Sequence, residues 1–486
     1  MNRLTVVDEI FLRTHRGMGT PIALQGLWRT PDAMEPALLQ AIHDRLRQGE
    51  LGRRVIDARV PGARRAWVPN TGAHPVDLLP NRPSSGELGW PTTTLAAVPG
   101  GHADPLAEVD MPPWADGLPS GDTSPLAQFD IPPRADDQPG SNAGPLAESD
   151  ILPWADTLGT DLDPQYSRGW RLSAARLDDG GTVVALTCSH ALADARGLLH
   201  AVTAALDSLA PDATTSAETT SRAAPLETRH EPHNPPSSDW ADARTQWTTI
   251  VTGTAAAARR WRPQRTSDRQ RVHPDSDRRQ LHSTVLTFDA DHWNTTASKA
   301  NGTPNSLFIH LTANILWHTG FPSSTITASL PVDTRDEPRV DNDLAMTEIT
   351  ITPTDTPATI RDKARTAYQH RMSSPAGLPE QILQVIPDRL AYTLSKGAGE
   401  RDILCSNIGT LPDAISTIGP HDCTRVAARA LHPGLTVFPR TRLSGYLSHL
   451  GDTYTLALVS LAADNDTLQA AIEKTCATAG LHPEPW

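Results

Sequence analysis

The residues best suited to chemistry follow an apolar run. In "VVALTCSHALADARG" (183–197) the run ends at Ser189 and His190, and Asp194 follows one helical turn later. A buried strand holds its last residue rigidly and commonly presents it to a cleft. An imidazole with an ordinary pKa near 6.5 can accept and return a proton at neutral pH. The pattern therefore indicates a general base, and it leaves open a core histidine bonded to Asp194 or to neighbouring backbone.

Cys188 offers a second kind of chemistry. It precedes His190 by two residues and so shares a strand face with it, which makes a thiolate nucleophile conceivable. Nothing nearby in the sequence lowers a thiol pKa, so a small core residue is the favoured interpretation. The four cysteines form no CxxC pair, and we expect neither a metal site nor a disulfide framework. Motifs typical of serine hydrolases, P-loop enzymes and dehydrogenases do not occur.

The elements that must position these residues alternate between strands and helices. Residues 20–29 show the pattern of a strand, and 169–206 that of a hairpin followed by a helix. The second half repeats this order, with a strand at 281–289 and a helix at 303–320 that opens on Thr-Pro and closes on glycine. We expect two comparable α/β lobes with mixed sheets and a cleft between them.

Composition divides the 486 residues further. We assign 1–207 to an N-terminal lobe and 241–486 to a C-terminal lobe. The polar, proline-rich segment 208–240 is expected to be a flexible linker. Within the first lobe, 81–163 carries 14 acidic and 2 basic residues, which is nearly the whole net charge of −13.

That acidic insertion contains three repeats of 20 residues. They begin at Pro105, Pro125 and Pro145 and read "PLAEVDMPPWAD", "PLAQFDIPPRAD" and "PLAESDILPWAD". Their prolines oppose regular helices and central strands, and a unit with two or three large apolar residues cannot bury a core alone. We predict a largely flexible insertion, the alternative being an ordered lid or a partner-docking arm.

Charge and hydropathy exclude some functions. No basic stripe with interleaved aromatic residues occurs, which argues against nucleic-acid binding. No run reaches the roughly 18 apolar residues of a membrane span, and the charged N-terminus is not a signal peptide. We therefore expect a cytoplasmic protein.

Three motifs, in order, resemble signatures of one superfamily. "SHALADARG" resembles a degenerate HHxxxDG, "SLPVDTRDEPRVDNDLAM" the second signature, and "CSNIGTLP" the Ser-Asn-x-Gly segment of the condensation-domain and acyl-CoA-dependent acyltransferase superfamily. This superfamily includes chloramphenicol acetyltransferase-like enzymes, wax ester synthases and polyketide-associated acyltransferases. The opening "LTVVDEIFL" is similar to the D-x-x-F start of the wax ester synthase branch. The resemblance implies two chloramphenicol-acetyltransferase-like lobes in a pseudo-dimer, with the site in an interlobe tunnel.

The resemblance also implies residue roles. His190 falls on the general base of the signature. Asp194 and Arg335 fall on a buried, structural salt bridge, and removing one partner of such a pair typically costs about 3–5 kcal/mol. The residues expected to line the tunnel, where they could orient the acyl group or a developing oxyanion, are Ser189, Asn342, Ser406 and Asn407.

Two positions depart from the signature. Ser189 replaces its first histidine, and the hydroxyl could support His190 by a hydrogen bond. Ala195 replaces its glycine, and the next glycine is Gly197. If that position needs a positive φ, alanine costs on the order of 1 kcal/mol.

The function implied is acyl transfer from a coenzyme A or carrier-protein thioester to an alcohol or amine. The thioester is a co-substrate, no other cofactor is expected, and a monomer suffices for a complete site. Two alternatives remain: a degenerate, non-catalytic protein that docks a partner, and a tunnel recruited for another reaction such as a cyclisation.

Overall fold

The computed structural model describes residues 3–16, 19–79, 144–209, 236–260, 281–369, 382–385, 401–435, 438–461 and 463–486. The described residues other than Gly144 belong to one compact unit, and residues 80–144 are not part of it. All helices and strands named below belong to this unit.

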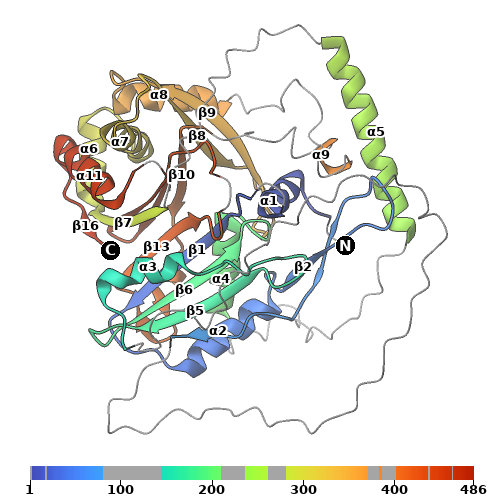
Figure 1. The fold of residues 1–486 in the computed structure, drawn as a ribbon, viewed down its shortest axis with the longest axis horizontal. Coiled ribbons are helices and arrows are strands. Elements are labelled where there is room, and N and C mark those ends of the chain that lie inside the picture. Colours follow the sequence, from blue (N-terminus) through green and yellow to red (C-terminus); the bar gives the residue numbers. More distant parts are fainter. Residues whose placement is uncertain are drawn as a thin grey trace, which may run out of the picture. The chain divides into compact units, whose positions relative to one another are not determined.

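A five-stranded sheet is the centre of the N-terminal lobe (Figure 1). Its order is β13-β1-β6-β5-β4, and only β4 and β5 run parallel. The strands are β1 (Ala23–Thr30), β4 (Asp77–Leu78), β5 (Trp170–Arg176), β6 (Thr182–Ser189) and β13 (Arg425–Leu431). Every residue of β6 is buried, as its unbroken apolar run predicts for a central strand. This strand ends directly before His190.

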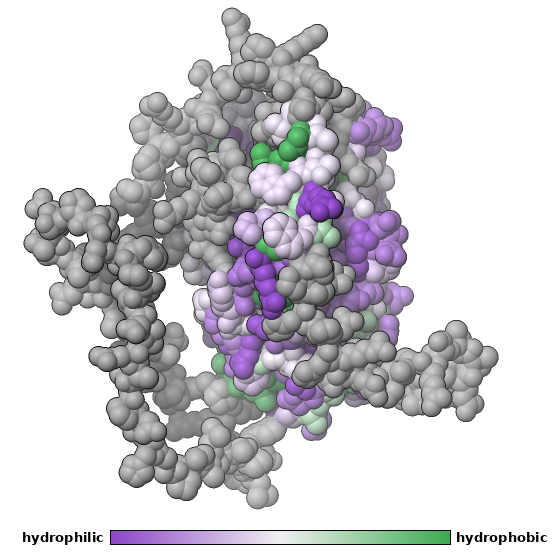
Figure 2. Space-filling model, turned by 90° about the vertical axis from the view of Figure 1, so that its right-hand side faces the viewer, coloured by the Kyte–Doolittle hydropathy of each residue, from purple (hydrophilic) through white to green (hydrophobic). Residues whose placement is uncertain are grey.

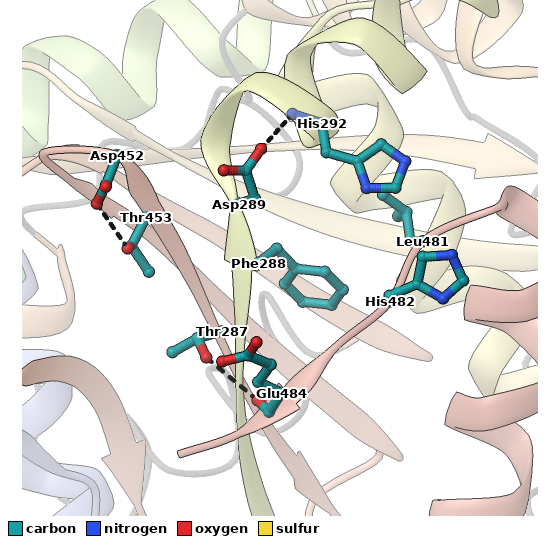
Figure 3. A pocket seen from close by; sticks show the side chains of 9 residues that line it. All are labelled: Thr287, Phe288, Asp289, His292, Asp452, Thr453, Leu481, His482 and Glu484. Carbon is teal, nitrogen blue, oxygen red and sulfur yellow. Dashed lines mark hydrogen bonds between the residues drawn. The ribbon is translucent and has the colours of Figure 1, made fainter.

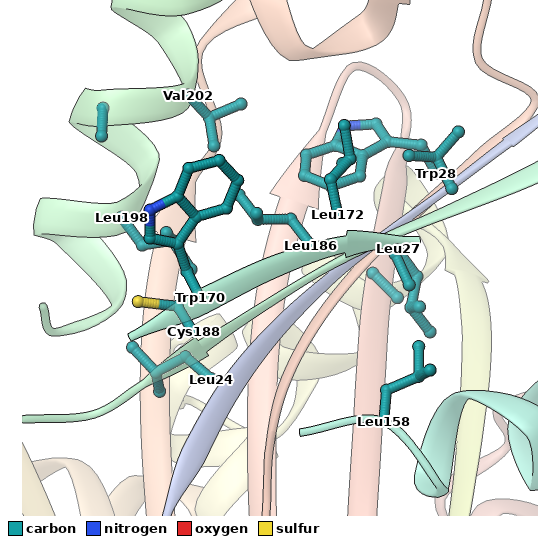
Figure 4. Close-up of a cluster of buried hydrophobic side chains, with 14 of the residues drawn as sticks. Leu24, Leu27, Trp28, Leu158, Trp170, Leu172, Leu186, Cys188, Leu198 and Val202 are labelled. Carbon is teal, nitrogen blue, oxygen red and sulfur yellow. The ribbon is translucent and has the colours of Figure 1, made fainter. Parts of the chain in front are cut away.

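Helices α2 (Pro36–Gln48) and α4 (Ala195–Asp207) contact each other and contribute to the core of this lobe. Figure 4 shows apolar side chains of β1, β5, β6 and α4 gathered in one buried cluster. α4 begins where Asp194 caps it, since the carboxylate accepts a 2.8 Å hydrogen bond from the backbone N–H of Gly197. The cap and the packed apolar face fix the chain that follows β6.

The C-terminal lobe contains a seven-stranded mixed sheet of order β16-β7-β15-β14-β10-β8-β9. Its strands are β7 (His282–Asp289), β8 (Ile326–Asp333), β9 (Leu344–Ile351), β10 (Ile403–Thr410), β14 (Leu443–Leu450), β15 (Thr453–Ser460) and β16 (Glu484–Pro485). β10 runs parallel to β8 and β14, and the other pairs are antiparallel. The mixed α/β architecture expected from the sequence is confirmed.

Four helices accompany this sheet: α6 (Ala290–Lys299), α7 (Pro304–His318), α8 (Pro357–Gln369) and α11 (Asn465–Ala479). α7 is apolar on nearly all sides because it lies in contact with β10 and β14 as well as with α8 and α11. It starts with a capping box between Thr303 and Ser306 and is followed by Gly320 at φ +89°. The predicted Thr-Pro opening and glycine ending are confirmed.

The lobes do not divide at the expected boundary. β13 lies in the C-terminal half of the sequence, yet it pairs with β1, with Ala23 opposite Leu431. The boundary at 241 falls inside helix α5 (Pro236–Arg260), so 236–240 form a helical turn and not a flexible linker. α5 contacts the first lobe, since Asp239 and Asp242 pair with Arg3 and Arg64. Composition cannot reveal such partners because they are distant in the sequence; residues 210–235 lie outside the described residues.

The end of the acidic insertion is ordered, which corrects the sequence prediction for that part. In the third repeat, Leu146 forms a bridge with Leu177, a 3-10 turn covers Glu148–Asp150, and α3 spans Ile151–Asp156. Ile151 is fully buried in the core cluster of the N-terminal lobe. The repeat cannot form a core alone, but it adds to one that exists. Residues 81–143, with the first two repeats, lie outside the described residues.

Smaller elements complete the lobes. They are α1 (Val6–Arg16), which the sequence analysis did not predict, the hairpin of β2 (Arg53–Ile56) and β3 (Ala66–Pro69), α9 (Ile382–Val385), a 3-10 turn at Asp413–Ser416, and the pair β11 (Thr417–Ile418) and β12 (His421–Asp422). α1 and β2 both contribute side chains to the site.

The surface on the side shown in Figure 2 is mostly hydrophilic or near neutral where it is described, with hydrophobic residues in small separate areas. The exposed large apolar residues of α5 are Trp240, Trp247 and Val251. Within the described ranges, no helix has the length and apolar character needed to cross a membrane.

Candidate active site

The connection between β8 and β9, residues 334–343, reaches from the second lobe onto the end of β6. Val340 is fully buried in the core cluster of the N-terminal lobe. Its carbonyl lies against Gly197, where an added Cβ would be 2.4 Å from the Val340 oxygen. Gly197 therefore permits this close approach. Ala195 is the first residue of α4 and does not have a positive φ, so the strain considered for it does not arise.

Asp194 and Arg335 form the ion pair that the resemblance implied. The Arg335 Nη2 atom lies 2.7 Å from each carboxylate oxygen, and the two side chains are 7% and 6% exposed. The same nitrogen donates to the Asp341 carbonyl at 2.6 Å, while Asp194 also accepts from the Asp343 N–H at 3.0 Å. The Asp194 carboxylate thus caps α4 and binds one end of the 341–343 segment, and Arg335 binds the other end.

Asn342 holds the imidazole of His190. Its amide Nδ2 donates to the carbonyl of His190 at 2.8 Å and to Asp8 Oδ1 at 2.9 Å. Both partners are acceptors, so they determine which end of the amide is the nitrogen. The amide oxygen then faces His190 Nδ1 at 3.1 Å and accepts a hydrogen bond from it, so Nδ1 carries the proton. The neutral tautomer with Nδ1–H has its lone pair on Nε2, as a general base requires.

The ring of His190 is partly exposed and stacks on Phe11 of α1, with the centroids 3.6 Å apart and the planes 13° from parallel. Burial lowers the pKa of His190, and its interactions with Asp194 and Asn342 only partly oppose this effect. Among the described residues, no side chain hydrogen-bonds to Nε2. The imidazole is therefore neutral at pH 7, and only its Nδ1 side is held by a side-chain hydrogen bond.

Asp8 is the buried carboxylate beneath this arrangement. Burial raises its pKa to about 6, although hydrogen bonds from the Thr5 N–H and from Asn342 lower it. Thr5 and Asp8 also cap α1 reciprocally, because the Asp8 N–H donates to the Thr5 hydroxyl at 3.0 Å. Asp8, Asn342 and His190 form a chain of hydrogen bonds through both lobes.

Two further side chains surround the site. His432 follows β13; burial lowers its pKa, and its interaction with His190 lowers it further. Arg53 of β2 donates to the Leu192 carbonyl at 2.7 Å and pairs with Asp341 at 2.5 Å, with its guanidinium 4.2 Å from the centre of the Trp67 ring. These contacts attach the 334–343 connection to the first lobe.

The residues expected to line a tunnel lie in different surroundings. Asn342 is buried against His190 and orients the ring. The Ser189 hydroxyl is buried, and within the described chain it makes no hydrogen bond, so the expected support of His190 is absent. Asn407 of β10 donates to Asn305 at 3.1 Å and accepts from the Gly409 N–H within a β-bulge; neither it nor Ser406 has a described bond to His190.

Cys188 is a core residue. It is fully buried, and burial raises the pKa of its thiol to about 12. A thiolate at this position is strongly disfavoured. The favoured interpretation of Cys188 as a small apolar side chain agrees with this environment.

Asp8, Phe11 and His432 were not identified from the sequence as site residues. Asp8 and Phe11 are the two fixed positions of the D-x-x-F opening, and a spacing of three places them on one face of α1. That motif was the available signal. His432 had none, because only the pairing of β13 with β1 brings it to the site.

Two cavities lie elsewhere. One of about 390 Å³ is lined by Arg335, Arg196 and His200, beside the Asp194 ion pair. The other, of about 360 Å³, lies in the C-terminal lobe, where Phe288, His292, His482 and Glu484 line it (Figure 3). Neither cavity is lined by His190, so the interlobe tunnel stays a prediction. The described residues contain no cluster of three or more potential metal ligands.

Solved structures similar to this one include condensation domains. The first condensation domain of the CDA synthetase matches with a TM-score of 0.54 and 14% identity, over 98% of this chain and 95% of that chain. The condensation domain of the Monacolin K polyketide synthase MokA matches with a TM-score of 0.53 and 12% identity, over 98% and 96% of the two chains. The chain has the two-lobed condensation-domain fold.

A nonribosomal peptide synthetase, FmoA3, matches with a TM-score of 0.51 and 14% identity, and this chain spans 99% of its own length but only 44% of that synthetase. In the other comparisons, no protein-family model and no curated protein matches the sequence.

Proposed function

We propose that the protein transfers an acyl group from a thioester, carried by coenzyme A or a carrier protein, to an alcohol or amine, with His190 as general base. The observation that carries this proposal is the orientation of His190. Asn342 and Asp8 fix Nδ1 as the protonated nitrogen and leave the Nε2 lone pair for substrate. A condensation-domain fold supports acyl or peptidyl transfer in natural-product assembly as the reaction class.

The reaction balances without a redox step. Nε2 of His190 accepts the proton of the acceptor O–H or N–H as that atom bonds to the thioester carbonyl carbon. The C–S bond then breaks, and the imidazolium returns the proton to the leaving sulfur, which gives an ester or amide and a free thiol. General-base catalysis of this kind contributes roughly 10²- to 10⁴-fold.

The test is thiol release from a panel of acyl thioesters with alcohol and amine acceptors. His190→Ala should lower turnover about 10²- to 10⁴-fold. His200→Ala is the matched control, since His200 lies on α4 of the same lobe but outside the hydrogen-bond chain. Unchanged turnover in the His190 variant would remove His190 from the mechanism.

One observation favours a second function. The Ser189 hydroxyl, where the signature has a histidine, has no bond in the described chain, as a degenerate site would show. A docking protein of this fold would bind carrier proteins yet release no thiol from any donor, and carrier-protein binding measured beside turnover distinguishes the two functions.

A further inference from the structure

His432 is a second imidazole at the site, and the proton transfers carried out by His190 do not involve it. It directly follows β13, as His190 directly follows β6. Both strands pair with β1, one on each side of it, and both run antiparallel to it. The two histidines therefore lie at the same end of the five-stranded sheet, with β1 between them.

The strand register places the two imidazoles on one face of this sheet. Ala23 of β1 is paired with the last residue of β6 on one side and with the last residue of β13 on the other. One residue further, the same register sets Ile22 between His190 and His432, and the His190 N–H donates to the Ile22 carbonyl at 2.9 Å. Directly opposed residues carry their side chains on the same face, and the two outer strands of such a row lie about 10 Å apart.

The two rings also have the same tautomer. Nδ1 of His432 lies 3.1 Å from the carbonyl oxygen of Pro21, which can only accept, so this nitrogen carries the proton. Asn342 fixes the proton of His190 on Nδ1 in the same way. Each ring therefore has its lone pair on Nε2, and among the described residues neither Nε2 has a hydrogen-bond partner.

Both rings are uncharged at pH 7. Burial lowers the pKa of each histidine, and the interaction with His190 lowers the pKa of His432 further. That interaction also indicates that the rings are close, because the effect of one charge on another falls with distance. Both residues are partly exposed. The site thus presents two neutral hydrogen-bond acceptors on one face of the sheet.

We propose that Nε2 of His432 binds the acceptor nucleophile beside His190 and selects primary amines. A primary amine has two N–H groups, and each can donate to one of the two Nε2 atoms. A secondary amine has one N–H and an alcohol has one O–H, so either acceptor satisfies only one ring. This inference rests on the proposed acyl transfer, and it adds His432 as a residue that contacts the acceptor.

The two hydrogens of a primary amine have different fates in the reaction. The N–H that faces His190 gives its proton to Nε2 as the nitrogen bonds to the thioester carbonyl carbon. The C–S bond then breaks, and the proton returns to the leaving sulfur. The second N–H is retained in the amide product and stays bonded to His432. His432 therefore neither gains nor loses a proton, and it orients the nitrogen lone pair towards the carbonyl carbon.

A comparison of matched acceptors tests this role in the full chain. Butylamine, N-methylbutylamine and 1-butanol share one carbon skeleton, and thiol release from the thioester panel gives kcat/KM for each. His432→Phe keeps an aromatic ring but has no acceptor nitrogen, so kcat/KM for butylamine should fall about tenfold, the value of one hydrogen bond. The values for the other two acceptors should change by less than about threefold, because neither has a second hydrogen to donate to His432.

Two further variants control for structural effects. The amide of His432→Gln can donate to Pro21 and accept from the substrate, so this variant should restore the preference for butylamine. His200→Phe on α4 is the matched control and should leave the ratio of butylamine to 1-butanol turnover unchanged. If His432→Phe lowers turnover equally with all three acceptors, His432 has a merely structural role and the proposal is overturned. Unchanged turnover with all three would overturn it as well.

A measurement without turnover separates this inference from the proposed function, and it also decides the case if His432→Phe does not fold. Nitrogen-15 NMR of the histidine-labelled chain follows each Nε2, with His190→Gln and His432→Gln for assignment. Butylamine should shift the resonances of both rings, and butyltrimethylammonium, which has no N–H, should shift neither. A His432 resonance that butylamine leaves unchanged would overturn the inference. Shifts of both rings without thiol release from any thioester would remove acyl transfer and retain His432 as an amine-binding residue.

Discussion

The imidazole of His190 is held by three side chains from two separate parts of the sequence, α1 and the β8–β9 connection. Phe11 stacks on the ring, Asn342 fixes the protonated nitrogen, and Asp8 fixes Asn342. Support of this kind orients a base without adding a charge in contact with it. The site therefore resembles a triad in which an amide lies between the carboxylate and the imidazole.

The first prediction concerns pH. Because burial lowers the pKa of His190, the protonated form appears only at lower pH than for an ordinary histidine near 6.5. We expect kcat/KM for acyl transfer to rise with pH through an inflection below 6.5 and to be level from there to neutral pH. An acid limb centred above 6.5 would contradict the assignment of His190 as the neutral base.

Asp8 permits a sharper test, because replacing it should lower activity without lowering stability. In Asp8→Asn the charge that fixes Asn342 is lost, so kcat should fall by tenfold or more. The loss should not exceed the roughly 10²- to 10⁴-fold that the base itself contributes. The free energy of unfolding at pH 7 should not fall, because the variant no longer buries a charge. A loss of stability that matches the loss of activity would assign Asp8 a merely structural role.

The raised pKa of Asp8 determines how the free energy of unfolding changes with pH. Asp8 has a folded pKa of about 6 against an ordinary aspartate value of 3.8, so the folded state binds more protons between these pH values. Its contribution to the free energy of unfolding therefore decreases by about 3 kcal/mol as the pH rises from 4 to above 6. Urea titrations across this range should show that decrease in the wild type but not in Asp8→Asn.

Among the elements, the connection between β8 and β9 carries most of the site. It supplies Arg335 and Asn342, and Val340 anchors it in the core of the other lobe. Glycine is needed at Gly197 because the backbone of this connection passes directly over α4. The connection and the start of α4 therefore form one structural unit.

The ion pair in this unit should show strong coupling. Arg335→Ala leaves the buried Asp194 carboxylate without its partner and should cost about 3–5 kcal/mol of unfolding free energy. Adding Asp194→Ala removes the stranded charge, so the double variant should lose less than the sum of the two single variants. Chemical denaturation of the four proteins measures the coupling, and strict additivity would contradict a buried pair.

The sequence predicts many helices and strands of each lobe but few of the side-chain contacts between the lobes. The apolar run of β6 and the caps of α7 follow from local patterns, and motif resemblance is sufficient to pair Asp194 with Arg335. The partner of Asn342 is not predictable in this way, because it depends on where α1 lies against the other lobe. The order of the third repeat was missed for the same reason: its contacts, among them the ion pair of Asp156 with Arg429, are with residues distant in sequence.

The two lobes are joined because the second half of the sequence contributes segments to the N-terminal lobe. β13 completes the first sheet from the second half of the sequence, and residues 334–343 complete the first core. Asp8 acts on His190 through an amide from the opposite lobe. The two halves thus fold as one unit although each has its own sheet.

The placement of β13 limits how the protein can be dissected. A fragment that stops after α4 would expose the edge of β1 with its unpaired backbone groups, which invites aggregation. A chimera with another protein of this fold would have to carry β13 from the same parent as β1, although 395 positions separate Arg29 from its neighbour Thr424 along the chain. Both halves of the chain should therefore be exchanged together, because each contributes strands to the five-stranded sheet.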